Sequence, residues 1–256
     1  MSNFNVTVQT ISIIIVLFFV PAMARWNSSH ANSTQYVINW SGYKWYIVHA
    51  QSSVPGSNHW NASNVFVDAR GRLHLKITRS VTIGEWDCAE LFSDSTFFYG
   101  TYRWKVQGRL DLLDPNVVLG LFSYSGPSGS NEIDIEVSKW GQPVHHPKHI
   151  YYTVYPGNGT AKQRVSLGAS LSLNGAYTTH WFTWTPPKVV FGSQHGFQNT
   201  PNKLKFLSYE TPSNFTEEMP KIANRLHMNL WLYESVPPAN RKEVEVIIHE
   251  FTYTPH

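Results

Sequence analysis

The sequence contains a single cysteine, Cys88, so no disulfide can form within the chain. It also has no cluster of Lys and Arg, and a formal net charge of only +3 gives no reason to expect nucleic-acid binding. Without disulfides, the fold must be stabilised by its core. We expect Cys88 to be a buried, unreactive thiol; a reactive or intermolecularly bridged cysteine is the alternative.

The first 24 residues lack Lys, Arg, Asp and Glu, and they have the pattern of a cleaved secretory signal. An almost unbroken apolar run from Ile11 to Val20 ends at Pro21 and is followed by Ala-Met-Ala, the small-residue pattern of a signal-peptidase site. A membrane anchor is the alternative, but the run is shorter than the roughly 20 residues that span a bilayer. We therefore expect cleavage after residue 24, secretion to the extracellular space and no stable membrane association.

Long helical patterns are missing from the remainder of the chain. After a flexible polar lead-in over 25–35, short runs rich in aromatic and β-branched residues alternate with clusters of Gly, Pro, Asn and Ser. These runs include 43–48, 73–78, 100–106, 117–122, 149–155, 181–185 and 244–253. Many short strands separated by turn signals predict an all-β sandwich that forms a single domain over 36–256.

Charged residues make up only 14% of the chain, yet three acids, Glu132, Asp134 and Glu136, stand at two-residue intervals in the segment EIDIE. On a β-strand, residues two positions apart point to the same face, so the three carboxylates should share one face. Like charges in one place raise each other's pKa, and at least one of the acids should hold a proton near neutral pH. A solvated strand face gains nothing from such an arrangement.

Paired carboxyl groups are the machinery of glycosidic bond cleavage. Retaining enzymes hold a nucleophile and an acid roughly 5–5.5 Å apart, whereas inverting enzymes need roughly 6.5–9.5 Å. On an extended strand the Cα atoms of Glu132 and Glu136 would be roughly 13 Å apart, a gap that two Glu side chains leaning together largely close. A solvated acidic strand and a Ca²⁺ site are the other interpretations, although Ca²⁺ sites usually draw ligands from a loop with backbone carbonyls.

Beyond this chemistry, the sequence resembles glycoside hydrolase family 16. EIDIE matches the shorter form of the family motif, E-[ILV]-D-[IVF]-E. Further segments agree in order and spacing, and the similarity covers roughly residues 36 to 255; these segments are Val65–Leu75, Ala89-Glu90, Phe98–Tyr102, Trp184–Pro186 and Met228–Trp231. The resemblance implies a concanavalin A-like jelly-roll sandwich of two curved antiparallel sheets, with a polysaccharide substrate crossing the concave face.

The resemblance also implies a role for each acid. Glu132 would be the nucleophile and Glu136 the general acid/base. Asp134 would orient the nucleophile and tune its pKa.

Three further residues would bind the substrate by the same resemblance. Glu90 would bind sugar hydroxyls, Tyr155 would lie near the scissile bond, and Trp184 would offer a stacking platform. No organic cofactor is implied and no metal ligand is assigned, although the family allows a structural Ca²⁺ on the convex side. The segment His145–His149 favours a loop rim over a metal site, because no carboxylate or Cys adjoins it.

The chain departs from the family pattern at three places. Ser130-Asn131 precedes the motif where many relatives have Trp-Asp or a second acid. Phe92 stands two residues after Glu90, where relatives carry Arg, and a Gln-His-Gly segment at 194–196 replaces Val-Asp-Gly. These departures bear on the identity of the substrate more than on the reaction.

Together, these features predict a monomeric, secreted endo-hydrolase that cleaves β-1,3 or mixed β-1,3/1,4 glucan by double displacement. A transglycosylase would use the same residues, with a sugar instead of water resolving the intermediate. A non-catalytic glycan-binding protein would share the sandwich, although this chain has kept all three acids. Glycosylation sequons occur at Asn27, Asn32, Asn39, Asn61, Asn158 and Asn214.

Overall fold

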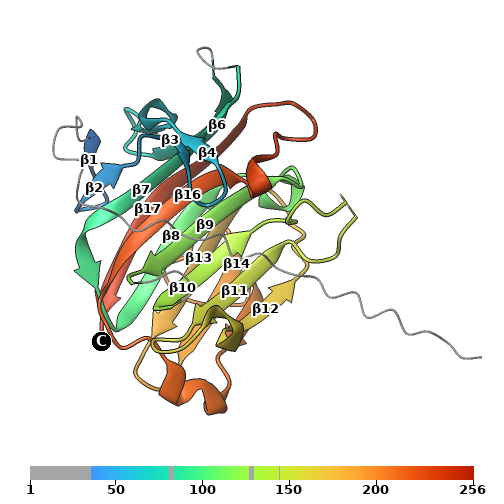
Figure 1. Cartoon of the computed structure of the whole chain (residues 1–256). Helices are drawn as coiled ribbons and strands as arrows, with labels where there is room; N and C mark the ends of the chain where they lie inside the picture. Colours follow the sequence, from blue (N-terminus) through green and yellow to red (C-terminus); the bar gives the residue numbers. More distant parts are fainter. Residues whose placement is uncertain (1–35, 81–83, 127–129, 144) are drawn as a thin grey trace, which may run out of the picture.

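A computed structural model describes residues 36–80, 84–126, 130–143 and 145–256, so the expected signal segment and lead-in lie outside the described residues. This part of the chain consists of strands joined by turns and short 3₁₀ helices, which confirms the all-β prediction (Figure 1). The strands are β1 (Tyr36–Trp40), β2 (Tyr43–Ile47), β3 (Ala50–Ser53), β4 (Asn58–Trp60), β5 (Val65–Val67), β6 (Leu73–Arg79), β7 (Trp86–Phe97), β8 (Gly100–Gln107), β9 (Val117–Tyr124), β10 (Glu132–Val137), β11 (Ile150–Tyr155), β12 (Val165–Ala169), β13 (Tyr177–Trp184), β14 (Val189–His195), β15 (Lys205–Glu210), β16 (Asn224–Leu232) and β17 (Val244–Pro255). The 3₁₀ helices are η1 (Ala62–Asn64), η2 (Leu110–Leu112), η3 (Ala161–Gln163), η4 (Ser213–Glu218) and η5 (Tyr233–Ser235).

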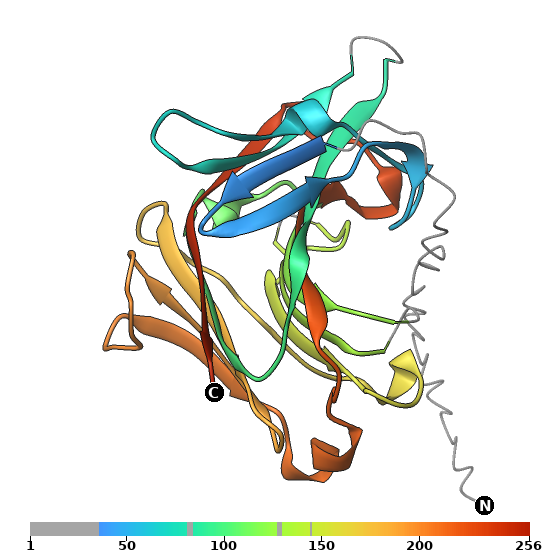
Figure 2. The same cartoon turned by 90° about the vertical axis from the view of Figure 1, so that its left-hand side faces the viewer.

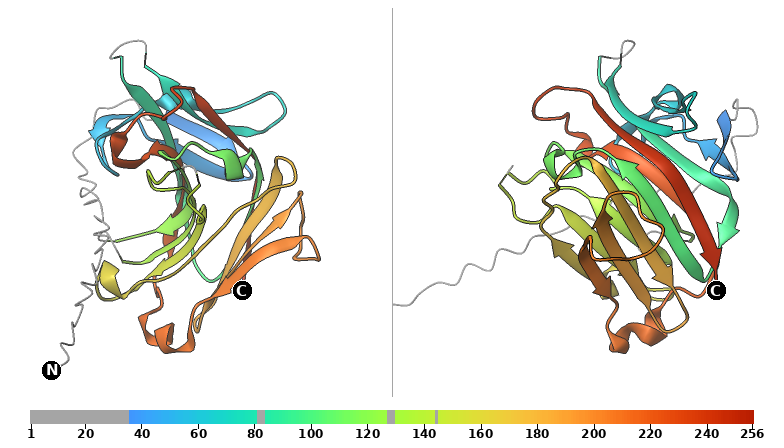
Figure 3. Two further views of the ribbon diagram at one scale, coloured as in Figure 1. Left: turned by 90° about the vertical axis from the view of Figure 1, so that its right-hand side faces the viewer. Right: turned by 180° about the vertical axis from the view of Figure 1, so that it is seen from behind.

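All of these strands except β3 and β4 form two curved antiparallel sheets; β3 pairs with β4, which runs parallel to the start of β7. The front sheet has the order β1-β2-β7-β16-β9-β10-β11-β12. The back sheet has the order β5-β6-β17-β8-β13-β14-β15. Pairing of β6 with the start of β7 joins the two sheets along one edge. The curvature seen in Figures 2 and 3 agrees with the predicted jelly-roll sandwich.

An aromatic core lies between the two sheets. Tyr152 of β11 stacks on Phe191 of β14 with ring centroids 4.9 Å apart, and Trp45 of β2 meets Phe251 of β17 edge-on at 6.0 Å. None of these four side chains is more than 1% exposed. Each such burial contributes roughly 1.5–3 kcal/mol, so contacts of this kind hold the front sheet firmly against the back sheet.

A buried polar network lies in the same layer. The Tyr152 hydroxyl is 2.6 Å from Ser193 Oγ, which is 2.6 Å from Nδ1 of His180. The other ring nitrogen of His180 is 2.9 Å from the hydroxyl of Thr178. Burial lowers the pKa of His180 to about 3, so the ring is neutral and both nitrogens are satisfied. Because Ile135 of β10 is paired with Tyr152, this network fixes the sheet next to the acid-bearing strand.

Cys88 is fully buried on β7, with its Sγ 3.4 Å from Asn58 Oδ1. Burial raises the pKa of the thiol well above its usual range, which favours the unreactive protonated form. The prediction of a buried thiol is therefore confirmed. Among the described residues there is no helix with the length and apolarity needed to cross a membrane.

Candidate active site

The three acids of EIDIE occupy one strand in the middle of the front sheet. The strand is β10, which lies between β9 and β11 (Figure 1), and Glu132, Asp134 and Glu136 occupy its alternate positions opposite to the core residues. The alternating residues Ile133 and Ile135 are 0% and 1% exposed and belong to the core. The two-residue period of the sequence thus places all three carboxyl groups on the outer face of the sheet, as predicted. We call them the acid row.

The residue before the acid row, Asn131, forms the turn that leads into β10. Asn131 has a φ of 51°, in the left-handed region that Asn tolerates better than most residues. Its backbone N–H donates to the carbonyl of Pro156, and its side-chain amide donates to the carbonyl of Gly157. Asn224 of β16 in turn donates to the Asn131 carbonyl at 2.8 Å. Asn131 therefore turns the chain into β10 and ties this turn to two other segments.

Asp134 lies in the centre of the acid row and is the most buried of the three acids, at 3% exposure. Its pKa is raised well above its usual value by burial, by the charges of Glu132 and Glu136, and by its hydrogen bond to Glu132. The same hydrogen bond lowers the pKa of Glu132, so Asp134 donates and Glu132 accepts. Asp134 therefore keeps its proton and favours the ionised form of Glu132.

The two glutamates also titrate abnormally. Burial and the charge of Glu136 raise the pKa of Glu132 to about 8, and burial raises that of Glu136 to about 7, against the opposing charge of Arg164. Part of the shift at Glu132 comes from repulsion by ionised Glu136, and this part disappears when Glu136 is protonated. In the free acid row Glu136 therefore ionises before Glu132, and protonation of Glu136 lowers the pKa of Glu132.

These shifts predict that the acid row destabilises the fold at alkaline pH. A carboxyl whose pKa is raised by folding stabilises the native state below its unfolded pKa of roughly 4.3, and that contribution is lost as pH rises through the folded pKa. We expect Glu136→Gln, which cannot ionise, to be more stable relative to the parent at pH 8.5 than at pH 4. The difference between the two effects on the free energy of unfolding should be about 3 kcal/mol. Denaturant titrations at both pH values measure this difference.

Glu217→Gln is the matched control, because the Glu217 side chain is 93% exposed and should show no such pH dependence. An effect of Glu136→Gln that is the same at both pH values would contradict the raised pKa.

Three tyrosines flank the acid row on the neighbouring strands. Tyr155 and Tyr124 are paired with Glu132 from β11 and β9, and Tyr151 is paired with Glu136. The pKa of Tyr155 is raised by burial and by the charges of the three acids, so its hydroxyl stays a hydrogen-bond donor. The Arg164 guanidinium lies 5.9 Å from the centroid of the Tyr155 ring. The structure therefore places Tyr155 beside the predicted nucleophile.

Glu90 lies on the same outer face, at some distance from the acid row. It is paired with Asn229 of β16, which is paired with Gly120 of β9 and through it with Glu136 of β10. Three strand spacings place Glu90 roughly 14 Å from Glu136 across the sheet. A chain of a few sugar rings could contact both residues at once. Glu90 is 14% exposed, and its Oε1 lies 3.2 Å from Nδ1 of His227. The structure thus aligns Glu90 with the acid row across the sheet.

Sequence reasoning missed Asn229, which lies between Glu90 and the acid row. A Cβ added to Gly120 would clash with Asn229 Oδ1, so the absence of a side chain at Gly120 makes room for this amide over β9. Asn229 is 3% exposed, and its Oδ1 has no hydrogen-bond partner in the described part of the chain. A glycine inside a strand often marks such a close approach, and Gly120 was the available signal.

The structure contradicts the role predicted for Trp184. This residue ends β13 in the back sheet, is 0% exposed, and meets the rings of Phe98 and Tyr99 edge-on at 5.2 and 5.3 Å. A ring with no exposed surface cannot stack on a sugar. Trp184 is a core residue, and the aromatic side chains that flank the acid row belong to β9 and β11.

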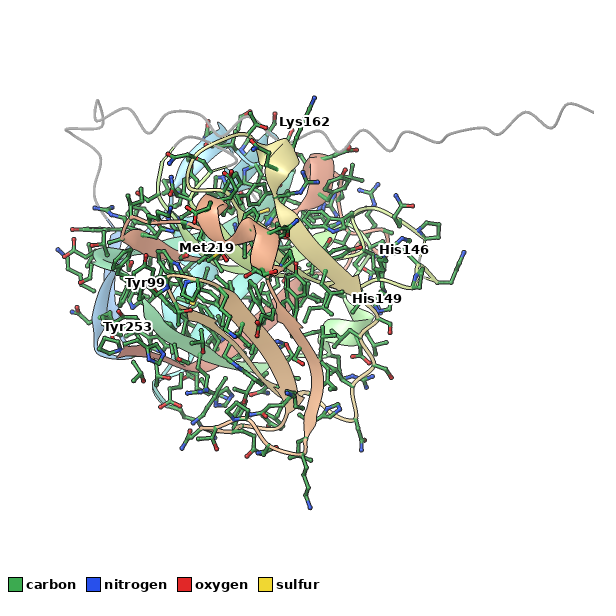
Figure 4. The ribbon with its side chains drawn as sticks, turned by 90° about the horizontal axis from the view of Figure 1, so that it is seen from below. Tyr99, His146, His149, Lys162, Met219 and Tyr253 are labelled. Atoms are coloured by element: carbon green, nitrogen blue, oxygen red, sulfur yellow. The ribbon has the colours of Figure 1, made fainter. Side chains whose placement is uncertain are left out.

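The histidine-rich loop follows β10. His149 Nε2 is 2.6 Å from the carbonyl of His146, and His146 Nδ1 is 3.0 Å from the carbonyl of Lys148 (Figure 4). The Nδ1 of His149 also lies 3.2 Å from the carbonyl of Leu171, so both rings bond backbone carbonyls. In the described ranges, no three His, Cys, Asp or Glu side chains are grouped so that they could hold a metal ion.

No protein-family model matches the chain, and no curated protein matches it in sequence. Solved structures do match. The β-glucanase of Bacillus licheniformis has a TM-score of 0.62 at 20% identity, covering 88% of this chain and 100% of that one. A glycoside hydrolase family 16 endo-glucanase from Bacteroides ovatus has a TM-score of 0.62 at 13% identity, covering 82% and 94%. A Mycobacterium tuberculosis protein described as an immunostimulatory antigen and pseudo beta-1,3-glucanase has a TM-score of 0.59 at 18% identity, covering 82% and 89%.

These likenesses show that the chain has the fold of glycoside hydrolase family 16, which confirms the predicted fold. At sequence identities of 20% or less, a structural likeness establishes the fold but not the activity. Because a protein described as a pseudo beta-1,3-glucanase shares this fold, the fold by itself does not establish catalytic activity.

Proposed function

We propose that the protein is a retaining endo-hydrolase of a β-glucan. The acid row carries the proposal: three carboxyl groups on one face of β10, with pKa values raised by burial and mutual interaction. Cleavage of a glycosidic bond needs a carboxylic acid that keeps its proton near neutral pH beside a second carboxyl group, and the raised pKa values of the acid row keep such a proton there. The glucanases that share its fold support β-glucan as the substrate class.

The reaction would proceed by double displacement. Glu132 attacks the anomeric carbon and forms a glycosyl ester, while Glu136 gives its proton to the departing glycosidic oxygen. Ionised Glu136 then takes a proton from water, whose oxygen attacks the anomeric carbon and releases Glu132. Asp134 would donate its hydrogen bond to Glu132 and so lower the pKa of the nucleophile against the effect of burial.

The proposed substrate is a β-1,3 or mixed β-1,3/1,4 glucan that lies across the strands of the front sheet. Glu90 and Asn229 would bind sugar hydroxyls at one end of this path, and Tyr155 would contact the sugar next to Glu132. Asn229 suits this task because its buried carbonyl oxygen can accept a hydrogen bond from a substrate hydroxyl.

We also propose that the protein is secreted and monomeric. The uncharged N-terminal segment of the sequence supports secretion.

The proposal also includes glycosylation in a eukaryotic host. Among the sequons within the described residues, Asn39, Asn158 and Asn214 are exposed, whereas the Asn61 amide donates to Asp87 at 2.9 Å. Asn39, Asn158 and Asn214 are therefore the acceptors that the folded protein accommodates most easily.

Incubation with laminarin, lichenan, xyloglucan, agarose and carrageenan tests the proposal. We expect laminarin or lichenan to be shortened rapidly to oligosaccharides, because an endo-enzyme cuts within the chain; size-exclusion chromatography follows the fall in polymer length. Products longer than the substrate at high acceptor concentration would indicate a transglycosylase. No cleavage of any polymer, together with equal retention of the parent and Glu132→Gln on one polymer, would indicate a glycan-binding protein and contradict the proposal.

A further inference from the structure

His227 of β16 is the side chain that holds Glu90. Its Nδ1 lies 3.2 Å from Glu90 Oε1, and the two side chains are only 15% and 14% exposed. A carboxylate that is largely removed from water needs such a donor, since water can no longer solvate it fully. No other hydrogen bond to the Glu90 carboxylate occurs among the described residues.

Two phenylalanines hold the His227 ring in place. His227 is paired with Phe92 of β7 on one side and with Phe122 of β9 on the other. The ring centroids lie 5.5 and 5.0 Å from His227, with interplanar angles of 26° and 22°, so all three rings are stacked in a row across the sheet. This packing restricts the rotation of the imidazole and keeps Nδ1 directed at Glu90.

Glu90 has no such donor on its own strand. Phe92 stands two residues after the glutamate, and its phenyl ring has no hydrogen-bond donor to offer. In this chain the donor comes from the neighbouring strand instead, and Phe92 packs against the ring that supplies it. A neutral imidazole with its proton on Nδ1 and an imidazolium can both donate there, so the contact does not depend on the charge of His227.

We propose that His227 is a positioning residue, which fixes the Glu90 carboxylate for binding of the sugar chain. This inference rests on the proposed function, because it assigns Glu90 to substrate binding. His227 acts through Glu90 and takes no part in the bond cleavage at the acid row. Losing it should therefore weaken substrate binding much more than it slows turnover.

Two variants of His227 distinguish the effect of its hydrogen-bond donor from the effect of its aromatic packing. His227→Phe keeps an aromatic ring between Phe92 and Phe122 but removes the donor, and it should raise KM about tenfold while kcat changes less than about threefold. His227→Asn keeps an N–H near the place of Nδ1 but gives up the stacking. It should return KM to within about threefold of the parent and should melt at a lower temperature than His227→Phe. A KM for His227→Phe within twofold of the parent would overturn the inference, as would equal KM values for the two variants.

A spectroscopic measurement needs no substrate. In the parent, ¹⁵N NMR at a pH where the imidazole is neutral should show His227 with its proton on Nδ1, and Glu90→Ala should abolish this preference. A tautomer that does not respond to Glu90→Ala would overturn the inference even in an active enzyme. If the parent hydrolyses no glucan, the proposed function fails, and the role in substrate binding fails with it; the NMR result then still decides whether His227 holds Glu90.

Discussion

Glu132→Gln is expected to lower kcat for glucan hydrolysis by at least about 10⁴-fold. The amide has the size of the carboxyl group but cannot attack the anomeric carbon, so the covalent step is lost. Binding should be retained, because Glu90, Asn229 and Tyr155 remain in place. Initial rates of reducing-sugar release from the best polymer of the panel measure kcat, and retention on the immobilised polymer measures binding.

The matched control for this variant is Glu217→Gln, the same substitution at an exposed carboxylate away from the acid row. It should leave both quantities unchanged. If Glu132→Gln hydrolyses every glucan at more than a tenth of the parent's rate, Glu132 is not the nucleophile.

Glu136→Gln should separate substrates by their leaving group. In a natural glucan the leaving group is a sugar alkoxide that must be protonated. We therefore expect Glu136→Gln to lower the rate of glucan cleavage by about 10³-fold or more. In a dinitrophenyl β-glycoside the leaving group is dinitrophenolate, which departs without being protonated. Formation of the glycosyl-enzyme from this substrate should slow by less than about tenfold. Single-turnover measurements on both substrates test this difference, since they report the first step alone.

Equal losses on the two substrates would show that Glu136 does not protonate the leaving oxygen. The carboxylate would then have an electrostatic role only, and the acid would have to be sought among the other groups of the acid row.

The acid row could be predicted from sequence because its geometry is local. A two-residue period on a strand determines which side chains share a face, and Glu132, Asp134 and Glu136 need no distant partner to meet. The cause of their raised pKa values was only partly foreseen. Mutual repulsion follows from the spacing, but burial is the largest cause at all three acids, and burial depends on strands far away in the chain.

The rest of the site depends on strand pairing that a single sequence does not contain. Glu90 and His227 are 137 positions apart, and only the pairing of β7 with β16 brings them together. The role predicted for Trp184 was wrong for a related reason. A motif match places a residue on a strand but does not say which face of which sheet the side chain occupies. Its neighbours on β13 are buried on both faces, so their pattern does not show where the ring points.

The most direct test of the account is the anomeric form of the first product, followed by ¹H NMR during cleavage of laminarin or lichenan. Double displacement through Glu132 predicts that the β-anomer appears first and that the α-anomer grows in only by mutarotation. Appearance of the α-anomer first would mean that water attacks directly. Glu132 would then be a general base rather than a nucleophile, and the proposed use of the acid row would be wrong.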